Sequence, residues 1–125
     1  MDLFTLIKLM FTVKGETMIT ESNFFDYRGD KGVAISVTVP RWYKGRRYHL
    51  LAPTSSLLFL WKNGHLEEDD YLHLYHADVL SRLDKEKIRK DLGEDAVLLC
   101  WERTGFCHRH IVVDWLNGKG LLDEV

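Results

Sequence analysis

Several features that mark other classes of protein are scarce in this sequence. Of its 125 residues only two are cysteine and two are proline, whereas a small secreted domain held together by disulfides carries more cysteines. No apolar run approaches the roughly 20 residues that a membrane-spanning helix needs. The 17 Lys and Arg residues nearly balance the 19 Asp and Glu residues, so no overall positive field favours nucleic acid as a partner. We therefore expect a cytoplasmic protein with reduced thiols that binds no membrane.

The remaining composition is that of a globular domain. Hydrophobic residues make up 46% of the chain and charged residues 29%, and this length is sufficient to bury one core. No repeat, linker or low-complexity tract divides residues 18–125, which we expect to form one domain. Residues 1–17 are an N-terminal extension with two explanations. In one, Lys14-Gly-Glu-Thr-Met18 back-translates to a ribosome-binding sequence before the natural start at Met18; in the other, the extension is an additional amphipathic helix.

The hydrophobic pattern predicts an α/β fold with a parallel, or mostly parallel, sheet packed by helices. Strands are expected at 18–20, 32–39, 96–100 and 121–122, and helices at 53–61, 67–83, 84–92 and 107–117. Strands that alternate with helices pair in parallel through crossover connections. Ligands bind such sheets beyond the carboxyl ends of the strands. The segments that follow Val39 and Leu99 are therefore the candidates for a functional site.

Reactive side chains are unusually dense in the segment after Leu99. They are Cys100, Glu102, Arg103, Cys107, His108, Arg109 and His110. The segment leads into a predicted helix, and the free N–H groups and dipole at a helix N-terminus attract anions. A cysteine at that position, here Cys107, is expected to have a lowered pKa. Arg103 and Arg109 have the paired donors that bind phosphate or carboxylate groups.

Two interpretations of this segment involve an anion. In the favoured one, Arg109 holds the anion of a ligand, while His108 and Glu102 orient the ligand or exchange protons with it. In the other, the segment is the loop of a cysteine-based phosphatase. That loop needs an arginine after a gap of five residues, and the arginines after Cys100 have the wrong spacing. The phosphatase interpretation is therefore disfavoured.

Two further interpretations involve the cysteines. Cys100, Cys107 and His110 are candidate metal ligands, because Cys107 and His110 are spaced by one helical turn, and Glu102 is a candidate fourth ligand. No second pair of cysteines or histidines accompanies them, so we assign no metal. In the remaining interpretation the segment is structural, with inert buried cysteines and an ion pair between Glu102 and Arg109 that locks the loop.

A second candidate segment, Pro40-Arg-Trp-Tyr-Lys-Gly-Arg-Arg-Tyr48, mixes aromatic and cationic residues. Side chains such as Trp42, Tyr43 and Lys44 can stack a base and hold its phosphate. If this loop meets the segment after Leu99, the resulting pocket has aromatic walls and a cationic floor. Alternatively, Trp42 and Tyr43 only cover the sheet while the charges are solvated.

The motifs as a whole resemble a known prokaryotic family. Leu98-Leu-Cys-Trp-Glu102 is followed by Phe106-Cys-His-Arg-His110 and Val113-Asp-Trp-Leu116, and this order is similar to the family called domain of unknown function 488. The resemblance covers roughly residues 18–125. It implies a compact α/β fold without an established activity, and it marks Cys100, Glu102, Cys107, His108 and Arg109.

The sequence thus predicts a protein that binds a phosphate-bearing ligand, either a nucleotide or a nucleic-acid end. The expected binding residues are Trp42, Tyr43, Lys44, Cys100, Arg103, Cys107 and Arg109. Two alternatives stay open: a hydrolase or transferase with Glu102 and His108 as its acid–base pair, and a small interaction protein in which the motif only braces the fold. The sequence identifies no cofactor and does not determine the oligomeric state.

Overall fold

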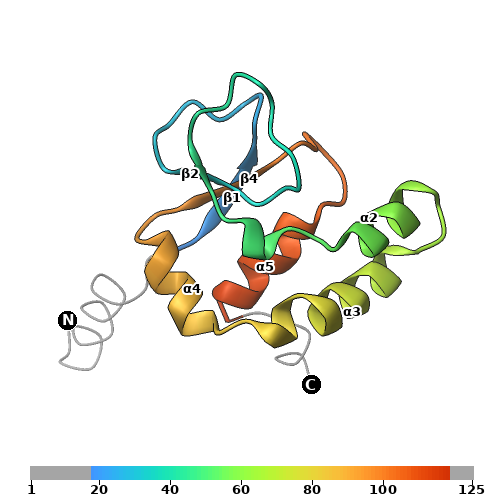
Figure 1. Ribbon diagram of the computed structural model, residues 1–125. Coiled ribbons are helices and arrows are strands. Elements are labelled where there is room, and N and C mark those ends of the chain that lie inside the picture. Colours follow the sequence, from blue (N-terminus) through green and yellow to red (C-terminus); the bar gives the residue numbers. More distant parts are fainter. Residues whose placement is uncertain (1–17, 119–125) are drawn as a thin grey trace, which may run out of the picture.

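The strand that comes last in the described part of the chain lies inside the sheet, between two strands that precede it. The computed structural model describes residues 18–118, and its four strands form one all-parallel sheet in the order β1-β4-β2-β3 (Figure 1). The strands are β1 (Thr20–Asn23), β2 (Gly32–Ala34), β3 (Arg46–Arg47) and β4 (Val97–Cys100). The predicted α/β fold with a parallel sheet is confirmed. The predicted strand at 121–122 and the extension at 1–17 lie outside the described residues.

The strand predicted at 32–39 is wrong in its length, because β2 ends at Ala34. Beyond it the chain bends away from the sheet. The Ser36 hydroxyl donates a hydrogen bond to the carbonyl of Thr38, and the indole of Trp101 donates to the same carbonyl at 3.0 Å. This bend opens the carboxyl edge of the sheet beside the end of β4.

The predicted helices are present, with small shifts in their ends. They are α2 (Ser55–Lys62), α3 (Glu68–Asp78), α4 (Lys85–Leu92) and α5 (His108–Leu116). Thr54 caps α2 and Asp84 caps α4 through their side chains, which satisfies free N–H groups of the first turn. The helix predicted to reach residue 83 ends at Asp78, and a short 3-10 helix follows at Leu80–Arg82. A second 3-10 helix spans His49–Leu51.

The two faces of the sheet are covered in different ways. Val33 and Leu98 point to the face that the helices cover, which we call the helix face, and they join the main hydrophobic core there. Ala34 and Leu99 alternate to the opposite side, which we call the loop face. They pack there with Phe24 and with residues of the loops that follow β1 and β2. Figure 1 shows the helices on one side of the strands and these loops on the other.

No helix between residues 18 and 118 is long and apolar enough to cross a membrane.

Candidate functional site

The residues of the candidate site meet where β4 ends and α5 begins. Cys100 is the last residue of β4, and alternation along the strand places it with Leu98 on the helix face. Cys107 is the N-cap of α5 and has an extended backbone, with φ −152° and ψ 146°, and His108 is the first residue of the helix. Gly105 turns the connecting loop with a φ of 81°, a conformation that favours glycine. The loop therefore returns Cys107 and His108 to Cys100.

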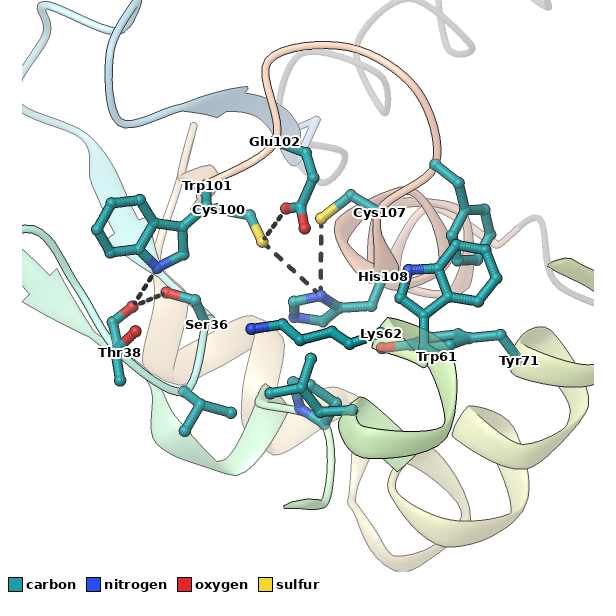
Figure 2. A pocket seen from close by; sticks show the side chains of 14 residues that line it. Ser36, Thr38, Trp61, Lys62, Tyr71, Cys100, Trp101, Glu102, Cys107 and His108 are labelled. Atoms are coloured by element: carbon teal, nitrogen blue, oxygen red, sulfur yellow. Dashed lines mark hydrogen bonds between the residues drawn. The ribbon is translucent and has the colours of Figure 1, made fainter. Parts of the chain in front are cut away.

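Two thiols converge on one imidazole nitrogen. Cys100 Sγ lies 3.9 Å and Cys107 Sγ 3.7 Å from His108 Nδ1 (Figure 2). The two sulfur atoms and a ring nitrogen lie within 4.8 Å of one another, and all three residues are buried. The carboxylate of Glu102 joins them, with Oε2 3.0 Å from Cys100 Sγ. The structure thus brings together four residues that the sequence singled out.

A backbone carbonyl orients the imidazole of His108 through the ring nitrogen that lies away from the thiols. Its Nε2 lies 2.8 Å from the carbonyl oxygen of Ile35, just beyond the end of β2. A carbonyl oxygen can only accept a hydrogen bond, so Nε2 carries the proton and donates it. In the neutral ring Nδ1 then has a free lone pair, and this lone pair faces the two thiols. The ring also packs 5.6 Å from the ring of Tyr75, which restricts its rotation.

The two thiols lie close enough to shift each other's pKa. The neighbouring thiol of Cys107 lowers the pKa of Cys100 most, burial opposes this effect and His108 lowers the pKa as well, so the net pKa is about 6. The neighbouring Cys100, together with burial, raises the pKa of Cys107. The predicted lowered pKa of Cys107 is therefore wrong, because its thiolate would lie beside that of Cys100 in a buried position. Burial raises the pKa of Glu102, but hydrogen bonds led by the one from Cys100 outweigh it, so the net shift is downward.

This cluster forms part of the lining of a cavity of about 220 Å³ at the carboxyl edge of the sheet. Its other walls come from the bend after β2, from α2 and α3, and from the loop before α5: Ser36, Val37, Thr38, Pro53, Leu58, Trp61, Lys62, Tyr71, Trp101 and Phe106. The rings of Trp61, Tyr71 and Phe106 pack against one another at 4.9–5.5 Å. In Figure 2 the side chain of Lys62 extends into the cavity between Ser36 and His108.

Arg109, the predicted anion-binding residue, does not line this cavity. It is 4% exposed, and its guanidinium forms hydrogen bonds within the protein. Nε donates to Glu21 Oε1 at 3.0 Å, and Nη1 donates to the carbonyl of Glu102 at 2.7 Å. The predicted ion pair between Arg109 and Glu102 is therefore wrong. The carboxylate partner is Glu21 of β1, and Glu102 contributes only its backbone oxygen.

His110 and Arg103 also lie away from the cluster. His110 Nδ1 is 2.5 Å from Glu21 Oε1, and its Nε2 is 3.0 Å from the carbonyl oxygen of Gly105. The histidine predicted to join the two cysteines is therefore the wrong one, and His108 takes that place. Arg103 pairs with Asp26 at 3.0 Å on the surface.

Trp42, Tyr43 and Lys44 line a separate hollow on the loop face. The two segments do not share a pocket: Trp42, Tyr43 and Lys44 line one hollow, whereas Cys100 and Glu102 line another. Contact between the two segments is indirect: Phe24 packs against Tyr43 at 5.1 Å and against Trp101 at 5.5 Å.

Sequence reasoning missed the cavity walls. Trp61 and Lys62 stand at the end of a predicted helix, and Tyr71 fits a core stripe of the next one. Ser36 falls within the predicted strand. The sequence gives none of these residues a signal that would connect it to Cys100, because only the fold brings them together.

Comparisons with protein-family models, with curated proteins and with solved structures find no match to this chain. The resemblance to domain of unknown function 488 stays a prediction from the sequence. The geometry of the site itself is therefore the basis for a functional proposal.

Proposed function

We propose that the floor of the cavity is a metal centre, and that the protein is a zinc-dependent hydrolase. The observation that carries the proposal is the convergence of Cys100, Cys107 and His108 on one buried point. Thiolate and imidazole are the ligands that zinc prefers. With bond lengths of about 2.3 Å to sulfur and 2.0–2.1 Å to nitrogen, tetrahedral zinc holds these atoms roughly 3.6 Å apart. The sulfur–nitrogen distances of 3.7 and 3.9 Å are close to this value.

The hydrogen bond of His108 to the backbone supports the same proposal. A metal-binding histidine usually donates its second ring nitrogen to a carboxylate or a carbonyl oxygen, which fixes the tautomer and the ring orientation. The bond from His108 Nε2 to Ile35 does this. The imidazole is thus oriented for a metal ion before any ion binds, and little reorganisation is needed.

The cavity would leave one side of such a metal centre accessible to water or substrate. A catalytic zinc site has three protein ligands and leaves the fourth position to water or substrate. Glu102 lines the cavity next to Cys100, and with zinc bound its carboxylate would act as the general base for a water molecule that the metal would activate. The predicted acid–base role is thereby assigned to Glu102 alone, because both ring nitrogens of His108 face protein groups. Ligation by thiolates also requires reduced cysteines, so the proposal includes the cytoplasm as the location.

Metal content tests this proposal. We expect the reduced protein to bind about one zinc ion per chain, measured by elemental mass spectrometry after gel filtration. Cys107→Ser and His108→Gln are expected to abolish binding. His110→Gln is the matched control, because it makes the same chemical change two residues away without touching the cluster. With cobalt in place of zinc, a thiolate charge-transfer band is expected and should disappear in Cys107→Ser.

Three outcomes would contradict the metal centre. The wild-type protein could bind no zinc or cobalt under reducing conditions, His110→Gln could lose as much metal as His108→Gln, or the cobalt complex could lack the thiolate band. If the cysteine variants only lower the melting temperature and no metal binds, the motif is structural.

A second candidate function is the predicted binding of a phosphate-bearing ligand without a metal. The observation that favours it is the ammonium group of Lys62, which extends into the cavity (Figure 2). The test is the melting temperature with a panel of inorganic phosphate and nucleotides. Stabilisation that persists in Cys107→Ser and is lost in Lys62→Gln supports this candidate, and the absence of any stabilisation excludes it.

A further inference from the structure

The loop face carries a cluster of aromatic rings that the metal centre does not use. Its rings come from three segments of the chain. Phe25 packs against Trp42 at 6.4 Å and against Trp101 at 6.2 Å, and Phe24 anchors the cluster from below. Phe25 and Trp101 are each 38% exposed and Trp42 is 56% exposed. Aromatic side chains that gather on a surface, rather than in a core, mark a contact site.

The same region is basic, although the chain as a whole is acidic. Residues 24–48 contain six Lys and Arg and only two Asp, whereas the rest of the chain contains eleven basic and seventeen acidic residues. The net charge of −2 is thus an average over two unlike parts. A local positive field at the loop face attracts polyanions even when the overall charge does not.

Some of these cationic side chains form hydrogen bonds within the protein, and others are free to contact a ligand. Arg46 lies on the helix face, where it donates to the carbonyls of Leu92 and Asp91 at 2.9 and 2.6 Å. Arg47 is its neighbour in β3 and pairs with Ala34, so alternation places it on the loop face. Lys44 borders the loop-face hollow. Neither Arg47 nor Lys44 forms an ion pair with another residue of the described range 18–118.

The loop-face hollow lies beside these residues. A hollow of about 600 Å³ lies between the two loops, with Phe24, Trp42 and Tyr43 among its aromatic lining and Arg28 and Lys44 among its cations. Asp30 is the acidic residue in its wall. Trp42 and Lys44 are therefore neighbours in one concave surface, and the partly exposed rings of Phe25 and Trp101 continue from Trp42 outside it.

We propose that the loop face binds single-stranded nucleic acid. Every base has a flat face that stacks on an aromatic ring, and the phosphates between bases need cations at short intervals. Trp42 and Trp101 would stack bases, while Lys44 and Arg47 would hold the backbone. Phe25 would support the two indoles, because its own ring is covered by the guanidinium of Arg103 at 5.4 Å. A duplex is disfavoured because its bases are already stacked on one another and cannot cover exposed rings. Since Trp101 also lines the cavity, a bound strand would pass the mouth of the candidate site.

Fluorescence anisotropy of a short labelled oligothymidylate tests this proposal on the full chain. Trp42→Ala is expected to weaken binding about tenfold, as the loss of one stacked base does. The double variant Lys44→Gln/Arg47→Gln should reduce the slope of log K against log salt by about 1.4, because each phosphate contact in a single strand contributes about 0.7. The matched control is Arg82→Gln/Lys90→Gln, which removes two exposed cations outside the loop face and should leave the slope unchanged.

The outcomes also separate this proposal from the metal centre. Cys107→Ser is expected to bind the oligonucleotide like the wild-type protein, so loss of zinc and loss of nucleic acid are independent results. Equal weakening by the control variant, or tighter binding of a duplex that Trp42→Ala does not affect, would overturn the stacking model. If neither oligothymidylate nor oligoadenylate binds at low salt, the proposal is wrong and a protein partner is the remaining occupant of the aromatic cluster.

Discussion

The helix face and the loop face of the sheet differ in what covers them and in what they expose. On the helix face, large side chains such as Leu98 and Tyr75 are fully buried under helices. On the loop face, Phe24, Ala34 and Leu99 are the only residues between 18 and 118 that are buried as a cluster, and the aromatic rings above them remain partly exposed. Burial of apolar surface provides most of the stability of a fold. The helix face therefore contributes most of the buried core, whereas the loop face buries less and leaves its aromatic rings partly exposed.

The two faces meet at the end of β4. Cys100 points to the helix face, where it lies with Cys107 and His108 in what we call the thiol cluster. The next residue, Trp101, packs in the aromatic cluster of the loop face. Consecutive residues of an extended chain point to opposite sides, so one short segment serves both regions. The candidate site lies at this junction, with both Cys100 and Trp101 in its lining.

The two faces are expected to differ most in the free energy of unfolding that is lost when an arginine is replaced. The arginine is buried on the helix face and exposed on the loop face. Arg109→Met leaves Glu21 and the carbonyl of Glu102 without their buried partner, and we expect the free energy of unfolding to fall by about 3 kcal/mol. Arg103→Met removes an exposed ion pair with Asp26 and should cost no more than about 0.5 kcal/mol. Urea denaturation followed by circular dichroism measures both. Equal losses in the two variants would show that Arg109 does not brace the helix face.

A smaller difference in lost stability is expected when the hydroxyl is removed from each of two tyrosines that donate to backbone carbonyls. The hydroxyl of Tyr75 is buried and donates to Leu51 at 2.5 Å, so Tyr75→Phe leaves a buried acceptor unpaired and should cost about 1.5 kcal/mol. The hydroxyl of Tyr43 donates to Arg46 at 2.6 Å in an exposed position. Water can replace it there, and Tyr43→Phe should cost about 0.5 kcal/mol or less. The same denaturation experiment compares the pair, and a larger loss for Tyr43→Phe would reverse the assignment of stability to the two faces.

The helix face could be predicted from the sequence because its signals are periodic and local. The stripe that includes Tyr71 and Tyr75 predicts a helix, and Asp84 marks the start of the next one by its capping chemistry. The thiol cluster was also predictable in part, since Cys100, Cys107 and His108 lie close together in the chain. Lys62 could not be connected to them, because only tertiary packing brings α2 to the cavity.

The choice of the wrong histidine has a specific cause. His110 was placed with Cys107 because residues three apart share a face of a helix. Cys107, however, is an N-cap with an extended backbone, so helical spacing does not apply from it. The turn into the helix places His108 beside the thiols and directs His110 toward Glu21. In the same way, the bend after β2 could not be predicted from a run of apolar residues that is typical of a longer strand.

The smallest expected effect concerns an exposed carboxylate of the loop face. Hydrogen bonds from Asn23 and then Arg103 lower the pKa of Asp26 below its ordinary value of 3.8. Because the folded-state pKa is depressed, the stabilisation is present above pH 3.8 and is lost as the pH falls through the folded-state value. A carboxyl titration by NMR should therefore give a pKa below 3.8 for Asp26. In Arg103→Met the pKa should rise only part of the way back, since Asn23 makes the larger contribution, and a full return to 3.8 would show that Arg103 acts alone.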